Sequence, residues 1–222
     1  MKRFLVALAV LALALNAGEP KDPVLKEHFN ATYRIVIFQS IVSGDNVMLE
    51  QRGSGSGTAI DEKHILTAKH VGEHANEPGT VLKAEQVGLD GTVIRSFPVK
   101  KAKLHPDTDL AILETIDELP FHVKLKYGEI DVGDEIVCVG FPIGIGKIVA
   151  KGTFSGVEGA AGYSRRGTIE RGQVSHVPGG PGNSGSLVRD TKGNVAGVLV
   201  AGHTDAPLVV LIPADIVKEF TK

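Results

Sequence analysis

The residues best suited to chemistry in this 222-residue chain form a short stretch near its C-terminal end, Gly179-Gly-Pro-Gly-Asn-Ser184-Gly-Ser186. Ser184 stands among residues too small to serve packing, which makes it a candidate nucleophile. The glycines permit backbone angles that let main-chain N–H groups converge on one point. Pro181 has no N–H, so the amides of Gly182 and Ser184 are the expected donors to an oxyanion. A surface turn has the same composition, and the chemical interpretation therefore depends on a base and an acid elsewhere.

A candidate base and a candidate acid lie upstream, each at the end of an apolar segment. His70 follows such a segment, which places an imidazole on a short turn or helix just beyond a strand. Asp109 directly precedes Leu-Ala-Ile-Leu, so its carboxylate could be buried where a strand enters the core, with an imidazole N–H compensating the lost hydration. Asp107 is the rival for this role. Each signal is weak alone, but the order His, Asp, Ser indicates a nucleophile with its base and orienting acid.

Short strands are predicted to position these groups. The sequence contains segments rich in Val, Ile and Thr, and these are separated by Gly, Pro, Asp and Asn. Their even spacing favours an all-β sandwich or barrel. A closing helix is predicted at 213–221, with Pro213 in its first turn. The predicted strands are Tyr33–Phe38, Gly57–Leu66, Thr80–Val87, Thr92–Leu104, Leu110–Glu114, Glu135–Phe141, Lys147–Val157, Gly167–Val174, Ser186–Arg189, Val195–Ala201 and Leu208–Ile212.

Composition supports one large all-β domain or two small halves. Apolar residues make up 42% of the chain, which is enough for a proper core. The formal net charge is −2 and there is no basic run, so nucleic acid is not an expected partner. The single cysteine, Cys138, lies in an apolar run and is predicted to be a buried structural thiol, and no internal disulfide can form.

The N-terminus is typical of a secretory signal peptide. A basic start precedes the apolar run Phe4–Leu15, which is short for a membrane span, and small residues follow before a polar turn. Cleavage after Ala17 is predicted, with a cut after Ala14 or Gly18, or an uncleaved anchor, as alternatives. We therefore expect residues 1–17 to be removed and residues 18–222 to be secreted or periplasmic, without stable membrane insertion.

Five segments together resemble a known family. They are Gly55–Ile60, Leu66–Val71, Thr108–Leu113, Gly140–Gly144 and Gly182–Gly185. They are similar to the chymotrypsin-like (trypsin-like, PA clan) serine peptidases, nearest the bacterial HtrA or Deg type, and the resemblance covers roughly residues 33–216. It implies one peptidase domain made of two perpendicular six-stranded β-barrels, at about 30–117 and 126–212, with the active site in the cleft between them.

The resemblance implies a serine endopeptidase that uses a Ser-His-Asp triad, with no cofactor and no metal. Ser184 would attack a peptide carbonyl while His70 takes its proton, and Asp109 would fix the imidazole tautomer. An acyl-enzyme would form and be hydrolysed by water. The oxyanion hole would consist of the amides of Gly182 and Ser184, each worth on the order of 3 kcal/mol.

The resemblance also implies where a substrate would bind: Pro178, Leu199, Val200, Ala201 and Gly202. Pro178 adds no charge to the pocket, and Leu199 stands where glutamate-specific relatives are expected to carry a histidine. Small or apolar residues are therefore expected before the scissile bond. The substrate backbone is expected to pair as an added strand along Val200–Gly202.

Two departures from related enzymes bear on activation and assembly. Asn183 replaces the aspartate that pairs with a newly cut N-terminus in the digestive enzymes, and a neutral amide cannot make that ion pair. Activation by N-terminal trimming is therefore not expected. The HtrA type usually carries a C-terminal PDZ domain, and none is expected before Lys222. Polypeptide substrates are the expected partners, and a monomer is expected, with a trimer formed through the N-terminal segment as the alternative.

Two other functions stay open. The segment His70-Val-Gly-Glu-His74 matches His-x-x-Glu-His, which on a helix would bind zinc with Glu73 as the base. Gly72 and Pro78 argue against such a helix. The second alternative is a peptidase fold retained as a catalytically silent binding module.

Overall fold

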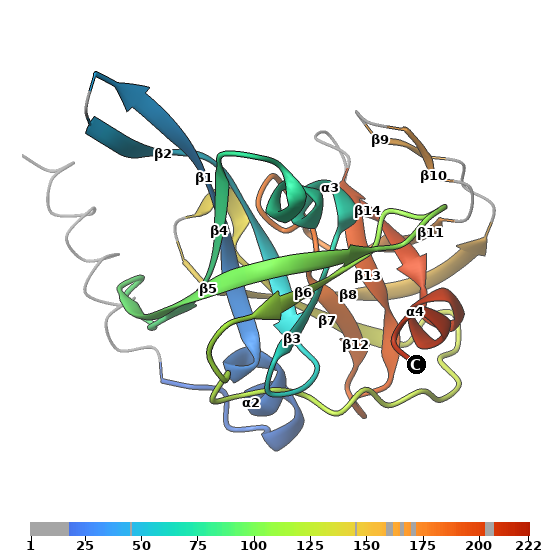
Figure 1. The fold of residues 1–222 in the computed structure, drawn as a ribbon. Coiled ribbons are helices and arrows are strands. Elements are labelled where there is room, and N and C mark those ends of the chain that lie inside the picture. The colour runs from blue at the N-terminus through green and yellow to red at the C-terminus, as the bar shows by residue number, and fades with distance from the viewer. Residues whose placement is uncertain are drawn as a thin grey trace, which may run out of the picture.

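Two closed β-barrels of six strands each make up most of the protein, together with a separate two-stranded sheet and a few short helices (Figure 1). The computed structural model describes residues 18–44, 46–144, 146–158, 162–164, 167–169, 172–202 and 207–222. The signal peptide predicted at 1–17 lies outside these residues. Within the described part of the chain, no helix has the length and apolarity that a membrane crossing requires.

The first barrel consists of β1 (Thr32–Ser43), β2 (Asn46–Ala59), β3 (His64–Thr67), β4 (Thr80–Val87), β5 (Val93–Leu104) and β6 (Ala111–Thr115). Its strand order is β1-β2-β3-β6-β5-β4, and neighbouring strands are antiparallel. Tyr33 and Phe97 are fully buried inside it and meet edge to face, with ring centroids 5.8 Å apart. Apolar packing of this kind fixes the strand ends that carry the site.

The second barrel consists of β7 (Glu135–Gly140), β8 (Ile148–Glu158), β11 (Gln173–His176), β12 (Leu187–Asp190), β13 (Val195–Gly202) and β14 (Leu208–Pro213). Its strand order is β11-β14-β13-β12-β7-β8. The short strands β9 (Gly162–Ser164) and β10 (Gly167–Ile169) pair with each other and, among the described residues, form a separate two-stranded sheet. Cys138 is buried as predicted, and this burial raises the pKa of its thiol to about 12.

Short helices connect and cover the barrels. They are α2 (Pro23–Asn30), α3 (Lys69–Gly72), the 3₁₀ turns η1 (Glu73–Asn76) and η2 (Pro142–Gly144), and α4 (Ala214–Phe220). The Asp22 side chain caps α2 by accepting the Leu25 N–H at 2.8 Å. Val217 and Phe220 of α4 join a core cluster that contains side chains from both barrels. This shared core holds the barrels together.

The predicted strand at Gly57–Leu66 is in fact two strands, β2 and β3, joined by a tight turn. The Asp61 Oδ1 accepts the N–H groups of Lys63 and His64, at 2.7 and 2.8 Å, which closes the turn. The predicted strand at Gly167–Val174 is likewise divided, into β10 and β11. The helix α2 was not predicted.

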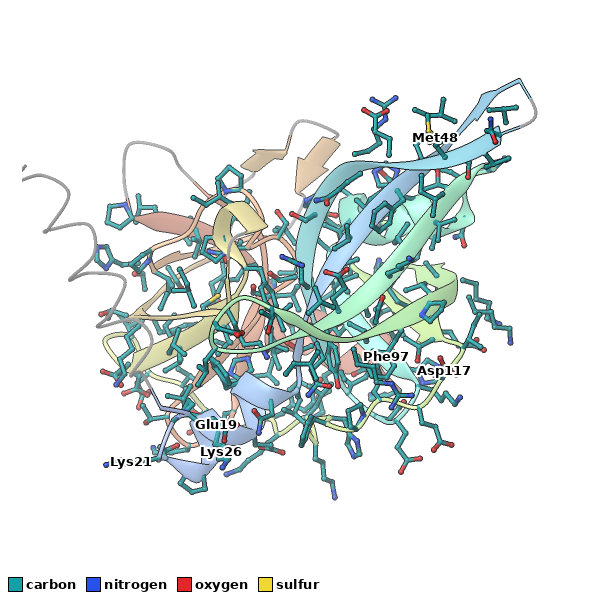
Figure 2. All side chains as sticks on the ribbon, turned by 90° about the vertical axis from the view of Figure 1, so that its left-hand side faces the viewer. Glu19, Lys21, Lys26, Met48, Phe97 and Asp117 are labelled. Atoms are coloured by element: carbon teal, nitrogen blue, oxygen red, sulfur yellow. The ribbon has the colours of Figure 1, made fainter. Side chains whose placement is uncertain are left out.

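The β1–β2 hairpin projects well beyond its barrel (Figure 1). Its outer part carries apolar side chains that are largely exposed, namely Val42 at 73%, Val47 at 66% and Met48 at 57%. Figure 2 shows Met48 on this projecting part. Pairing between the two strands, rather than burial in the barrel core, therefore supports this ribbon. The base of the hairpin leads back into the site described next.

Candidate active site

His70 and Asp109 meet because the strands next to them are paired. Thr67 at the end of β3 lies opposite Ala111 at the start of β6, which brings the segment after β3 against the loop before β6. The His70 backbone N–H donates to Asp109 Oδ1 at 2.9 Å, and the ring Nδ1 lies 2.7 Å from Asp109 Oδ2. The side chains are 29% and 13% exposed, respectively. Both carboxylate oxygens thus hold one histidine, which fixes the orientation of its ring.

Asp107, the rival for the acid role, takes part in a different turn. The backbone N–H groups of Asp107 and Thr108 donate to the Nδ1 of His105, at 3.2 and 3.1 Å. The structure therefore brings Asp109, not Asp107, to His70.

Ser184 lies in the loop between β11 and β12, and it faces the same cavity as His70. This cavity has a volume of about 330 Å³. The Ser184 carbonyl accepts the Ser56 N–H at 2.8 Å, which ties the serine loop to the first barrel. No hydrogen bond joins Ser184 Oγ to the His70 ring among the described residues. Bonds of this type often tighten only when a substrate binds.

The other walls of this cavity come from the first barrel. They include a hydrogen bond between His74 Nδ1 and Glu77 Oε2 at 2.7 Å, and the side chain of Arg52 at the base of the hairpin. The remaining lining residues are Ile37, Gln39, Gly53, Ser54, Val71 and Thr80. None of the lining residues belongs to β13, so the cavity lies on the first-barrel side of Ser184.

The loop before Ser184 is held from two sides. Gly182 has φ +95°, and its carbonyl accepts a hydrogen bond from Ser56 Oγ at 2.7 Å. The Pro181 carbonyl accepts the Ile143 N–H at 2.6 Å. Within the described residues, the amides of Gly182 and Ser184 donate to no acceptor. Both amides are therefore available to an oxygen of a ligand.

The expected substrate-binding residues divide between core and surface. Leu199 and Val200 are buried, Ala201 is half-buried, and Pro178 and Gly202 are exposed.

The edge of β13 next to the serine loop could accept a further strand. Ala201 and Gly202 pair with β14 on one side, while on the other side the pairing of β13 with β12 stops at Val198. Leu199 still bonds to the serine loop on that side, because its carbonyl accepts the Gly185 N–H at 2.7 Å and its N–H donates to the Ser186 carbonyl at 2.9 Å. Beyond Leu199, this edge of β13 is unpaired among the described strands.

The two histidines of His70-Val-Gly-Glu-His74 do not converge on one point. The Nδ1 of His70 contacts Asp109, whereas that of His74 contacts Glu77, at 2.7 Å in each case. The segment is also not one regular helix, because α3 ends at Gly72 and a 3₁₀ turn follows. The described part of the chain contains no cluster of three or more His, Cys, Asp or Glu side chains suited to a metal ion.

Sequence reasoning missed two residues that support the serine loop. Ser56, on β2 of the first barrel, joins the serine loop to the segment after β7, because its Oγ donates to the Gly182 carbonyl and also accepts the Phe141 N–H at 3.0 Å. It lies within the Gly55–Ile60 segment, but the sequence does not show the direction of its hydroxyl. The Nη1 of Arg34 donates to the carbonyl of Gly144 at 2.8 Å. The pattern of apolar and polar residues around Arg34 in the sequence does not indicate that contact.

A His–Asp pair on one six-stranded barrel and a glycine-flanked serine on a second define the chymotrypsin-like class of fold. The family described as "Trypsin-like peptidase domain" matches residues 55–198, and the chain belongs to this family. The predicted family and all-β, two-barrel fold are thereby confirmed.

Curated relatives of the HtrA type support the same assignment. The chain is 30% identical over 156 residues to "Probable periplasmic serine protease do/HhoA-like" of Haemophilus influenzae, covering 68% of this chain and 31% of that protein. It is 28% identical over 171 residues to "Serine protease Do-like HtrA" of Bacillus subtilis, covering 70% and 35%. It is 24% identical over 220 residues to "Serine endoprotease DegS" of Escherichia coli, covering 87% and 57%. The chain thus spans less than two thirds of the length of each of these relatives.

A solved structure shares the fold over nearly the whole chain. It is the crystal structure of an inactive form of Rv3671c from Mycobacterium tuberculosis, with a TM-score of 0.64 and 19% sequence identity. The match covers 91% of this chain and 92% of that one. At this identity the likeness shows the fold alone.

Proposed function

We propose that this chain is a serine endopeptidase in which Ser184 is the nucleophile, His70 the base and Asp109 the orienting acid. The observation that carries the proposal is the double contact of His70 with Asp109, at 2.9 and 2.7 Å, beside the cavity that Ser184 shares. An ionised carboxylate only accepts hydrogen bonds, so Nδ1 carries the ring proton. The Nε2 lone pair is then free to take the proton of Ser184.

The reaction follows from these roles. Ser184 Oγ attacks the peptide carbonyl while Nε2 of His70 takes its proton, and the resulting imidazolium later protonates the leaving amine. The amides of Gly182 and Ser184 stabilise the oxyanion, each by on the order of 3 kcal/mol. Water then attacks the acyl-enzyme in the reverse sequence, with His70 again acting as the base. No step needs a metal or a cofactor.

The β13 edge and the first-barrel cavity, on opposite sides of Ser184, suggest how a polypeptide substrate would bind. The unpaired edge at Val200–Gly202 can bind the part before the scissile bond as an added strand. The first-barrel cavity of about 330 Å³ can then take the residues after the scissile bond.

Small or apolar residues are proposed before the scissile bond. Pro178 and Leu199 bring no charge to that side of Ser184. A Cβ on Gly179 would meet the side chains of Val209 and Leu199, so the space beneath this glycine is already apolar and filled.

Export of the protein is part of the proposal. The Haemophilus influenzae relative is named periplasmic, and the first 17 residues have the pattern of a signal peptide. Residues 18–222 would then form the mature peptidase domain, acting on polypeptides in the periplasm or outside the cell.

Cleavage of a peptide library by residues 18–222, with Ser184→Ala as the matched control, tests this proposal. We expect chelator-insensitive cleavage after small or apolar residues, and a loss of roughly 10³-fold or more in Ser184→Ala. A clear preference for acidic or basic residues would refute the proposed specificity. Cleavage that survives in Ser184→Ala and stops with a chelator would support the zinc alternative. No cleavage by the wild type would support a binding module.

A further inference from the structure

The guanidinium of Arg34 links the two barrels next to the serine loop. Arg34 lies on β1, and its side chain is only 18% exposed. Its Nε and Nη2 donate to Glu85 Oε2 of β4, at 2.8 and 2.6 Å. Its Nη1 donates to the carbonyl of Gly144 at 2.8 Å, in the turn that follows β7 of the other barrel. A largely buried cation, held by one carboxylate, thus fixes a main-chain carbonyl across the barrel boundary.

The turn that Arg34 holds has an unfavourable backbone conformation. Ile143 has φ +50°, in the left-handed region that a β-branched residue rarely adopts, and Gly144 has φ +70°. The Ile143 side chain is 71% exposed, so packing of that side chain does not impose this conformation. Hydrogen bonds must hold the turn instead, and the bond from Arg34 is one of them.

This turn sets the direction of the peptide unit between Pro181 and Gly182. The Ile143 N–H donates to the Pro181 carbonyl at 2.6 Å. In a planar trans peptide the C=O and the N–H point in opposite directions, so the Gly182 N–H points away from the turn. Gly182 also packs directly on the turn, since a Cβ there would meet the backbone of Phe141 and Ile143.

Asn183 does not supply an equivalent anchor. Its side chain is buried, and its Oδ1 has no hydrogen-bond partner among the described residues. The side chain next to the nucleophile therefore does not anchor the loop through this oxygen. The bonds from the turn and from Ser56 remain.

We propose that Arg34, supported by Glu85, is a positioning residue for the oxyanion hole. It holds the turn at Pro142–Gly144, and the turn keeps the Gly182 amide directed toward the substrate oxygen. Without Arg34 the turn relaxes, and the peptide unit between Pro181 and Gly182 can rotate. The Pro181 carbonyl then takes the position of the Gly182 N–H. This inference rests on the proposed function, because it concerns the same peptidase site.

Arg34→Ala should lower kcat with little change in KM. Complete loss of one oxyanion donor lowers kcat by about 10²- to 10³-fold, and partial misplacement should lower it by roughly 10- to 100-fold. KM should change by less than about threefold, because the interaction at stake forms in the transition state. Arg34→Lys should recover part of kcat, since an ammonium can reach one of the two acceptors but lacks the planar fork that reaches both.

The experiment compares kcat and KM for a peptide anilide with the affinity for a peptide trifluoromethyl ketone, whose adduct carries an oxyanion. Arg95→Ala is the matched control, because Arg95 lies in the same barrel with its guanidinium 4.7 Å from the Phe97 ring. The proposal predicts that Arg34→Ala loses ketone affinity in parallel with kcat, while Arg95→Ala keeps both. Thermal unfolding of each variant establishes that it is folded at the assay temperature.

Unchanged kcat and ketone affinity in folded Arg34→Ala would overturn the proposal, as would equal losses in Arg95→Ala. If Arg34→Ala does not fold, Arg34→Lys and Glu85→Gln are measured in the same way, and wild-type values in both would overturn it. A wild type that neither cleaves peptides nor binds the ketone would refute the proposed function itself. An active wild type with an unaffected Arg34→Ala would refute only the role of Arg34.

Discussion

Asp109→Asn should lower kcat by about 10⁴-fold while leaving the fold intact. In the wild type, one carboxylate oxygen accepts the His70 backbone N–H at 2.9 Å, and the other lies 2.7 Å from the ring Nδ1. Asparagine has nearly the same shape but only one acceptor oxygen. If that oxygen keeps the backbone N–H, the amide NH₂ faces Nδ1 and forces the ring proton onto Nε2. His70 then cannot take the proton of Ser184, and a 10⁴-fold loss corresponds to about 5.5 kcal/mol of transition-state stabilisation.

The assay is steady-state cleavage of a peptide anilide near pH 7.5, with thermal unfolding of each variant. Asp107→Asn is the matched control, because Asp107 lies two residues away and its backbone N–H is bonded to His105 rather than to His70. Its kcat should stay within about twofold of the wild type, as expected of a residue outside the reacting groups. A kcat of Asp109→Asn within tenfold of the wild type, or an equal loss in Asp107→Asn, would refute the reasoning.

Two further predictions follow from the oxyanion loop and from a buried histidine. Gly182→Ala should lower kcat by roughly 10²-fold or more in the same assay, because Gly182 has φ +95° and a Cβ would meet the Phe141 carbonyl. Gly180→Ala, whose Cβ would meet nothing within 4 Å, should be nearly neutral, and equal effects of the two changes would contradict this account. Burial of His28, the main cause, lowers its pKa from 6.5 to about 3, so folding favours the neutral ring. Between pH 6.5 and 3 the unfolded chain binds a proton at His28 that the folded protein does not bind. The free energy of unfolding is therefore highest above pH 6.5 and falls as the pH drops toward 3, by about 1.4 kcal/mol per pH unit. Urea unfolding between pH 4 and 6 should therefore show a steeper acid loss in the wild type than in His28→Leu, and parallel curves would exclude this role for His28.

The proximity of His70 to Asp109 could be predicted from the sequence because both lie at ends of apolar strands. Neighbouring strands bring such ends together, and the buried carboxylate needs the imidazole as a partner. The glycine-rich loop around Ser184 could be interpreted as a nucleophile loop only together with His70 and Asp109, since a surface turn has the same composition. These inferences depend on residue type and local order, which a sequence displays directly.

The support of the oxyanion loop could not be predicted, because it depends on contacts between residues far apart in the chain. Arg34 and Gly144 are 110 positions apart, and Ser56 and Gly182 are 126 apart. An arginine on a β-strand normally suggests solvent exposure, so its direction across the barrel boundary leaves no local pattern.

Some element boundaries were missed for local reasons. The sequence pattern predicts one strand across Asp61, where the structure has a turn. This turn was missed because the two side-chain hydrogen bonds that close it are not visible in the hydrophobic pattern. The outer part of β2 was missed because its residues 46–52 are exposed and show no alternation between buried and exposed sides. The helix α2 carries a readable signal in Asp22 followed by Pro23, a capping residue and a first-turn proline.

Labelling of residues 18–222 with a fluorophosphonate probe, followed by mass-spectrometric mapping, tests the central claim most directly. The probe reacts preferentially with a nucleophile that an adjacent base activates. We expect chelator-insensitive labelling at Ser184, and its loss in His70→Ala. Labelling at another residue, or labelling of Ser184 that is undiminished in His70→Ala, would contradict the assignment of Ser184 and His70 as nucleophile and base.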